Sequence, residues 1–270
     1  MAAPAAVRLA HRLAQGENAA RRLVEAGRAM VGAALGPALR PDERAALGLR
    51  LYADALGPHP EADGEPFAWE RSWWAADLPA APATLLVGGA GAGREVRALA
   101  DAGYEIWAWD PVPAAAEALS RRLGPGNTAC ARHEDTDRWP GPARVDAVIF
   151  GWGSLTHVLD AGDRARVLAA ADARTDGPIL ASVWTREAFP PPSGRAASLG
   201  ATVGGVLGRL RGVPPEDSDA LGYAPWCGFG HRFEPGELEA LGRALGRTTD
   251  FRAGPYPHVT WRRALRRSPG

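Results

Sequence analysis

A glycine-rich turn between a short apolar run and a helix is the feature that most constrains the fold of this chain. Residues 83–89 read ATLLVGG, and the glycines continue as Gly89-Ala-Gly91-Ala-Gly93 before a helical segment, REVRALADAG. Glycines at such a junction allow a sharp turn and a close approach of the backbone to a ligand. The start of the helix presents free N–H groups above the turn. The segment predicts a strand–turn–helix unit that binds a ligand, and the alternative is a tight turn that binds nothing.

An acid stands at the end of the next apolar run. This run reads YEIWAWD and ends in Asp110. If the two runs are neighbouring parallel strands, the Asp110 carboxylate lies beside the glycine turn, where it accepts hydrogen bonds from both hydroxyls of a ribose. The two segments together predict a nucleoside site.

Short apolar runs alternate with helical segments over much of the chain. After the first two runs come TACARHED, ARVDAVIFGW and GPILASVW, and the segments TTDFRAG and HVTWRRAL close the chain. Strands that alternate with helices imply a parallel sheet covered on both faces, with right-handed crossovers. We expect an α/β fold: a doubly wound, mostly parallel seven-stranded sheet with a C-terminal antiparallel hairpin, plus an N-terminal helical extension.

The glycine spacing separates two classes of nucleotide-binding fold. The dinucleotide fingerprint is G-x-G-x-x-G; counted from Gly89 its third glycine would fall on Arg94, and counted from Gly91 on Val96. The run is instead G-x-G-x-G. With this spacing the chain resembles the class I (Rossmann-like) S-adenosylmethionine-dependent methyltransferases over roughly residues 83 to 185, and more loosely at the hairpin. The resemblance implies S-adenosyl-L-methionine as the cofactor.

Positions are carried over from that family one by one. In that family the glycine turn and the acid after the second strand bind the cofactor. An acid after the third strand contacts the adenine amino group, and the turn after the fourth strand contacts the methionine portion. The expected cofactor-binding residues are therefore Gly89, Ala90, Gly91, Gly93, Asp110, Pro111, Glu134, Asp135, Gly151, Trp152 and Gly153. One position departs from the family, because Val87 stands where the family usually has an acid that helps to hold the methionine amino group.

Two histidines are candidates for a general base, because an imidazole titrates near neutral pH. His157 follows the fourth strand, and His231 lies in the segment YAPWCGFGHRF. For His157 the alternative is a structural or cofactor-contacting histidine. Cys227 and His231 alone do not complete a four-ligand site, so no metal is expected.

Aromatic residues mark the expected acceptor side. A cluster at Phe67, Trp69, Trp73 and Trp74 precedes the first strand and either seals the N-terminal helices onto the core or covers the cofactor. We expect Trp73, Tyr223, Trp226 and Phe229 to contact the acceptor. The expected domains are an N-terminal helical cap over residues 1–75 and the S-adenosylmethionine-binding domain over 76–270, with an acceptor-side insertion at 186–231.

Composition excludes several classes of function. The 31 basic and 31 acidic residues balance, which provides no field for nucleic acid or an anionic membrane. Every basic residue is Arg, so Schiff-base chemistry and a Walker-type phosphate loop are excluded. Two cysteines are too few for a disulfide framework, and no stretch of about 18 apolar residues occurs, so we expect a cytoplasmic protein without a signal peptide or membrane span.

The predicted function is a class I methyltransferase that acts on an O or N nucleophile of a small molecule or natural product, or of a peptide. The alternatives are a non-catalytic S-adenosylmethionine-binding partner subunit and a nicotinamide-dinucleotide oxidoreductase. The partners expected are the methyl acceptor and neither nucleic acid nor membrane, and a homodimer is left open.

Overall fold

The computed structural model describes residues 5–57, 64–191, 193–213 and 220–263. Two compact units divide the chain. One contains residues 1–40 and 191–219, and the other contains residues 41–190 and 220–270. The expected boundary at residue 75 does not separate these units, because the helices Pro41–Leu56 and Ala68–Asp77 both belong to the larger one.

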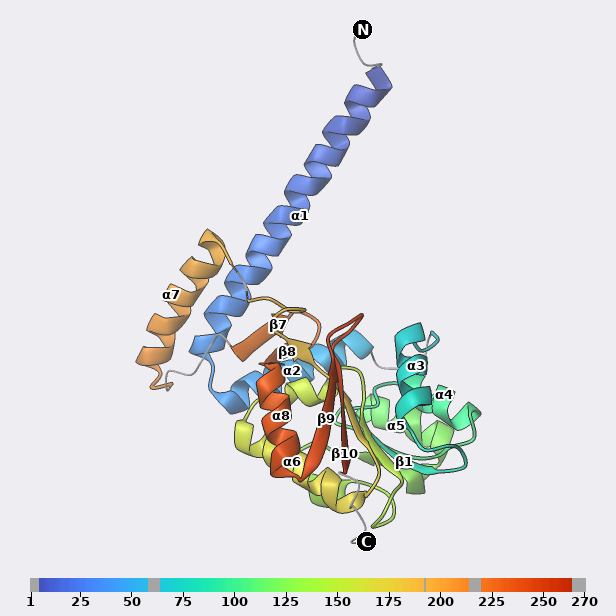
Figure 1. Ribbon diagram of the computed structural model, residues 1–270. Helices are drawn as coiled ribbons and strands as arrows, with labels where there is room; N and C mark the ends of the chain where they lie inside the picture. The colour runs from blue at the N-terminus through green and yellow to red at the C-terminus, as the bar shows by residue number, and fades with distance from the viewer. Residues whose placement is uncertain (1–4, 58–63, 192, 214–219, 264–270) are drawn as a thin grey trace. The chain divides into compact units, whose positions relative to one another are not determined.

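The smaller unit is a pair of helices, α1 (Ala5–Ala38) and α7 (Arg195–Leu210), which lie side by side (Figure 1). Three glycines spaced four apart form one face of α7. A Cβ on any of them would lie 2.2 to 2.3 Å from a carbonyl oxygen of α1, so the two backbones are in direct contact. The pairs are Gly200 with Met30, Gly204 with Ala34, and Gly208 with Pro37.

The larger unit is built on a seven-stranded sheet in the order β3-β2-β1-β4-β5-β10-β9. All neighbours pair in parallel except β10, which runs antiparallel to both β5 and β9. The predicted sheet and its C-terminal hairpin are confirmed, with β10 inserted between β5 and β9. The strands are β1 (Thr84–Gly88), β2 (Glu105–Asp110), β3 (Thr128–Cys130), β4 (Ala147–Phe150), β5 (Ile179–Ser182), β9 (Arg247–Arg252) and β10 (His258–Arg263).

Helices cover both faces of this sheet (Figure 1). Because side chains alternate along a strand, Leu86 faces one core, with α6 and α8, while Leu85 and Val87 face the other, with α3, α4 and α5. Both faces are thus apolar, as a buried parallel sheet requires. The helices are α3 (Ala68–Asp77), α4 (Arg94–Asp101), α5 (Pro113–Leu123), α6 (Ala161–Arg174) and α8 (Pro235–Ala244).

A second, small sheet forms where the sequence predicted only an irregular insertion. Its order is β6-β8-β7, with β6 at Trp184–Thr185, β7 at Leu221–Ala224 and β8 at Gly228–Phe233. The helix α2 (Pro41–Leu56) packs on β8 at a glycine contact: a Cβ on Gly228 would lie 2.5 Å from the Cα of Gly48. Segments far apart in the sequence thereby meet beside the large sheet.

No helix in the described part of the chain is both long enough and apolar enough to cross a membrane.

The buried arginine Arg247 joins the hairpin to the rest of the sheet. Its side chain is fully buried, Nε lies 2.6 Å from Asp172 Oδ1, and the guanidinium donates to the carbonyl oxygens of Thr175 and Gly177, both at 2.6 Å.

We expect Arg247→Ala to lower the free energy of unfolding by about 3 kcal/mol, because removing the guanidinium leaves these acceptors without their donor. The exposed Arg243→Ala, which breaks only a surface pair with Glu239, should change it by less than about 0.5 kcal/mol. Urea denaturation measures both, and equal effects would contradict this role for Arg247.

Candidate functional site

The glycine turn after β1 adopts a backbone that only glycine tolerates. Gly89, Gly91 and Gly93 all have positive φ, at 63°, 54° and 94°. A Cβ on Gly89 would also lie 2.3 Å from Cβ of Ser154. The turn therefore packs closely against Ser154 at the carboxyl ends of β1 and β4.

Asp110 holds this turn against β2. It is fully buried; Oδ2 accepts from the backbone N–H of Gly91 at 2.8 Å, and Oδ1 from that of Val112 at 2.9 Å. Burial raises the pKa of Asp110 to about 6, and the two backbone N–H groups act in the opposite direction. Each oxygen retains a lone pair for a further donor.

The turn after β4 lies directly against the glycine turn. The N–H of Gly151 donates to Gly88 O at 2.8 Å, that of Trp152 to Glu95 Oε1 at 3.2 Å, and that of Gly153 to Ser182 Oγ at 2.9 Å. Trp152 itself is 48% exposed. The two turns together present backbone and one aromatic ring to the space above them.

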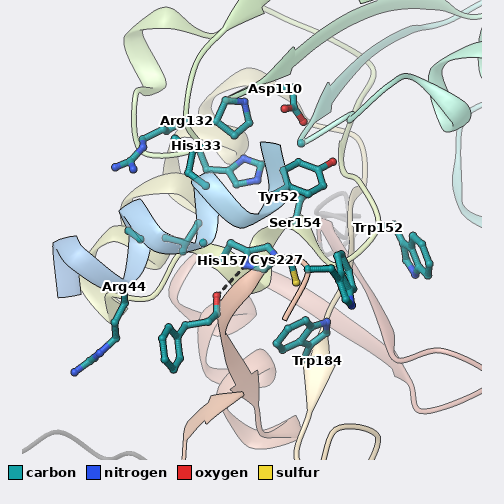
Figure 2. A pocket seen from close by; sticks show the side chains of 18 of the residues that line it. Arg44, Tyr52, Asp110, Arg132, His133, Trp152, Ser154, His157, Trp184 and Cys227 are labelled. Carbon is teal, nitrogen blue, oxygen red and sulfur yellow. Dashed lines mark hydrogen bonds between the residues drawn. The ribbon is translucent and has the colours of Figure 1, made fainter. Parts of the chain in front are cut away.

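A cavity of about 200 Å³ opens over these turns, within the larger unit. Figure 2 shows Asp110 and His133 at one end of the cavity, Trp184 and Cys227 at the other, and His157 between them. The predicted residues that line it are Gly89, Asp110, Pro111, Glu134, Trp152, His157, Trp226 and Phe229. Of the other predicted cofactor residues, Ala90, Gly91, Gly93, Gly151 and Gly153 lie in the turns beneath it, and Asp135 turns back to accept from the N–H of Arg132 at 3.1 Å.

His157 is held in one orientation. It ends the short helix η3 (Ser154–His157), and its Nδ1 lies 2.9 Å from the carbonyl oxygen of Phe229, drawn as the dashed line in Figure 2. Since a carbonyl only accepts, Nδ1 carries the proton and Nε2 is an acceptor. Burial lowers the pKa of His157, so the ring is neutral near pH 7.

His133 is a second imidazole in the cavity wall. It is 8% exposed, it packs edge-on against Trp109 and Phe150, and its Nδ1 has no hydrogen-bond partner among the described residues. Burial, and secondarily His157, lower the pKa of His133 to about 3. Glu134, the next residue, also lines the cavity, and burial raises its pKa.

The end of the cavity away from Asp110 is aromatic (Figure 2). Trp184 stacks on Phe189 with ring centroids 5.1 Å apart, and Phe189 meets Tyr256 edge-on at 5.8 Å. From α2, Tyr52 brings its Oη to 2.9 Å from the position of a Cβ on Gly91. The cavity thus combines a backbone end with an aromatic end.

Three of the predicted catalytic and acceptor residues do not line the cavity. Nε2 of His231 pairs instead with Glu237, 2.7 Å from Oε2. Trp73 is buried against the sheet, where Nε1 donates to Thr260 Oγ1 at 2.8 Å, and Tyr223 packs on Phe229. Within the described residues, His, Cys, Asp and Glu side chains form no group that could hold a metal ion.

Sequence reasoning missed several of the lining residues. His133 directly precedes Glu134, so the same loop gave a signal for it. Tyr52, Trp184 and Tyr256 come from α2, β6 and the β9–β10 loop, and no local motif marks them as lining residues of one cavity. The further lining residues are Arg44, Ala45, Gly48, Leu49, Arg132, Ser154, Val158, Phe189 and Cys227.

Comparison with known proteins gives no match to a family model and none to a curated protein sequence. Solved structures do match. The CcbJ methyltransferase from Streptomyces caelestis aligns with TM-score 0.53 and 17% identity, over 78% of this chain and 96% of that one. A SAM-dependent methyltransferase from Methanosarcina mazei aligns with TM-score 0.51 and 16% identity, over 74% and 99% of the two chains. A sugar N-methyltransferase from Streptoalloteichus aligns with TM-score 0.50 and 16% identity, over 73% and 86%.

The predicted fold is therefore confirmed: this chain has the fold of the class I S-adenosylmethionine-dependent methyltransferases. At these identities the likeness is one of fold.

The burial of His133 predicts how stability depends on pH. Because the pKa of His133 is lowered in the folded state, the unfolded chain binds a proton below pH 6.5 that the folded protein does not. Stability is therefore lost as the pH falls through 6.5, by about 2 kcal/mol between pH 7.5 and pH 5 from this residue. We expect His133→Phe to lose about 2 kcal/mol less than the wild type over this range in urea denaturation. A ring that titrates near 6.5 by NMR would contradict this account.

Proposed function

We propose that this chain is an S-adenosylmethionine-dependent methyltransferase that acts on an O or N nucleophile of a small molecule or natural product, or of a peptide. The observation that carries the proposal is the cavity itself. The glycine turn and Asp110 form one end of it, His157 lies in its middle, and aromatic rings form the other end. The class I fold supports it.

The residues present fit this cofactor. Asp110 has a free lone pair on each oxygen, which suits two ribose hydroxyls, and Gly89 lines the cavity beside it. Glu134 follows β3, where the resemblance to the class I family implies a contact with the adenine amino group. The partly exposed ring of Trp152 suits a sulfonium, because aromatic faces attract cations.

S-adenosylmethionine, when bound, supplies a methyl group on a positively charged sulfur. The protein has to align an acceptor with that carbon, which is mainly a matter of positioning. For a hydroxyl or a charged amine it also has to remove a proton. Nε2 of His157 is the acceptor for that proton, because Nδ1–H is engaged by Phe229. His231 takes no part in the proposal, since Glu237 occupies its Nε2.

The aromatic end of the cavity supports a proposal for the class of acceptor. Trp184, Phe189, Trp226, Phe229 and Tyr256 present aromatic surface, and α2 covers the cavity with Leu49 and Tyr52. Such walls favour a flat, largely apolar acceptor. Phenols and aromatic amines carry the O or N nucleophile on such a frame.

The first test is titration calorimetry with S-adenosylhomocysteine. We expect micromolar binding to the wild type and at least about 10-fold weaker binding to Asp110→Ala, because charge-assisted hydrogen bonds to the ribose are lost. Asp101→Asn, an exposed acid at the end of α4, is the control and should bind as the wild type does. If the folded wild type does not bind, the proposal fails, and titration with a nicotinamide dinucleotide then tests the oxidoreductase alternative.

The second test concerns His157. We expect His157→Gln to lower the rate of methyl transfer to phenol or aromatic-amine acceptors by about 100-fold or more, with unchanged affinity for S-adenosylhomocysteine. Because burial lowers the pKa of His157, the wild-type rate should stay constant as the pH falls from 8 to 6.5 and decline with one protonation below that. The variant should lack this decline. A variant with the wild-type rate and pH profile would remove His157 from this role.

A further inference from the structure

Glu95 is a buried carboxylate in the first turn of α4, next to the glycine turn. It is 5% exposed, and its Oε1 accepts from the N–H of Trp152 at 3.2 Å and from Arg94 Nη2 at 3.3 Å. A buried carboxylate is costly unless its charge is compensated. The negative charge of Glu95 therefore requires a compensating group.

Arg94 does not do so alone, because another acid shares it. Its Nη1 and Nη2 donate to the two carboxylate oxygens of Glu70, each at 2.7 Å, and the Glu70 side chain is 3% exposed. Two buried carboxylates thus share one guanidinium. Burial raises the pKa of Glu95 to about 7; Arg94 opposes this shift, and the charge of Glu70 adds to it. With both acids ionised, the cluster is one positive charge short.

The second oxygen of Glu95 lies near Gly151, in the turn after β4. No hydrogen bond reaches Oε2 from another described residue, and Oε2 lies 3.5 Å from the position of a Cβ on Gly151. The carbonyl oxygen of Gly89 lies 2.8 Å from that same position and also accepts no hydrogen bond from a described residue. Two acceptors without donors therefore converge where Gly151 leaves room.

We propose that Glu95 Oε2 and the carbonyl oxygen of Gly89 bind a primary ammonium, the α-amino group at the amino-acid end of the cofactor. An ammonium has three donors and a positive charge, and so meets both the missing donors and the missing charge. The inference rests on the proposed function. The β1 side chain at this level, Val87, is fully buried in the sheet core and offers no carboxylate, so α4 supplies it in place of the strand.

The space for the ammonium requires glycine at residue 151. A methyl group there would lie 2.8 Å from Gly89 O and 3.3 Å from Gly88 O, in the space that the two free acceptors share. Backbone N–H donors from Gly151 and Trp152 are already engaged by Gly88 O and Glu95 Oε1. These two N–H groups are therefore not available to the two acceptors, and the ammonium of a ligand can supply the donors.

The test is titration calorimetry of the full chain with three ligands. These are S-adenosylhomocysteine, its analogue that lacks only the α-amino group, and 5′-methylthioadenosine, which lacks the whole amino-acid end. We expect Glu95→Gln to weaken S-adenosylhomocysteine binding at least about 10-fold and to leave the other two within about twofold. Glutamine retains the size of the side chain and an oxygen for the N–H of Trp152. Glu117→Gln, an exposed acid on α5, should bind all three ligands as the wild type does.

The affinities of the wild type for two of these ligands provide a second test that needs no variant. We expect it to bind the analogue without the amino group at least about 10-fold more weakly than S-adenosylhomocysteine. Equal affinity for these two ligands, or an equal loss for all three ligands in Glu95→Gln, would overturn the inference while leaving the proposed function intact. A wild type that binds none of the three overturns both.

Discussion

The pair of backbone hydrogen bonds accepted by Asp110 is the contact on which the site depends. One carboxylate ties the glycine turn of β1 to the end of β2 through Gly91 and Val112, in full burial. Backbone donors take the place of a counter-ion, which is why the carboxylate is tolerated there at all. The same oxygens keep lone pairs for hydroxyl groups, so we propose that the group that holds the turn also binds the ribose.

A second set of charges links three elements around this turn. Glu70 on α3, Arg94 and Glu95 on α4, and the N–H of Trp152 after β4 form one connected cluster. Phe67 and Trp152 lie under the Arg94 guanidinium, with ring centroids 5.1 and 5.5 Å from its carbon. The cluster fixes the position of the turns and leaves one negative charge unmatched beside them, which is a useful arrangement for a cofactor with an ammonium group.

The aromatic end of the cavity depends on close approach between distant segments. α2 reaches β8 because Gly48 and Gly228 have no side chains at the contact, and this brings Tyr52 and Leu49 over the turns. His157 bridges the two ends, since its Nδ1 bonds to Phe229 of β8 while η3 follows directly from the β4 turn. One imidazole thus links the turn after β4 to the small sheet.

The sequence by itself determined the large sheet, the turn and the acid beside it. Strand periodicity is local, and only glycine meets the positive φ at Gly89, Gly91 and Gly93, so these features are written in consecutive residues. The tertiary structure alone decided which histidine lines the cavity. Nε2 of His231 pairs with Glu237, six residues later in the chain, whereas His157 lies in the cavity wall. It also decided that Tyr52 lies beside Gly91, that Tyr256 lies beside Gly153, and that no described residue donates a hydrogen bond to the second oxygen of Glu95. Such outcomes depend on packing between segments far apart in the sequence, and no local pattern encodes them.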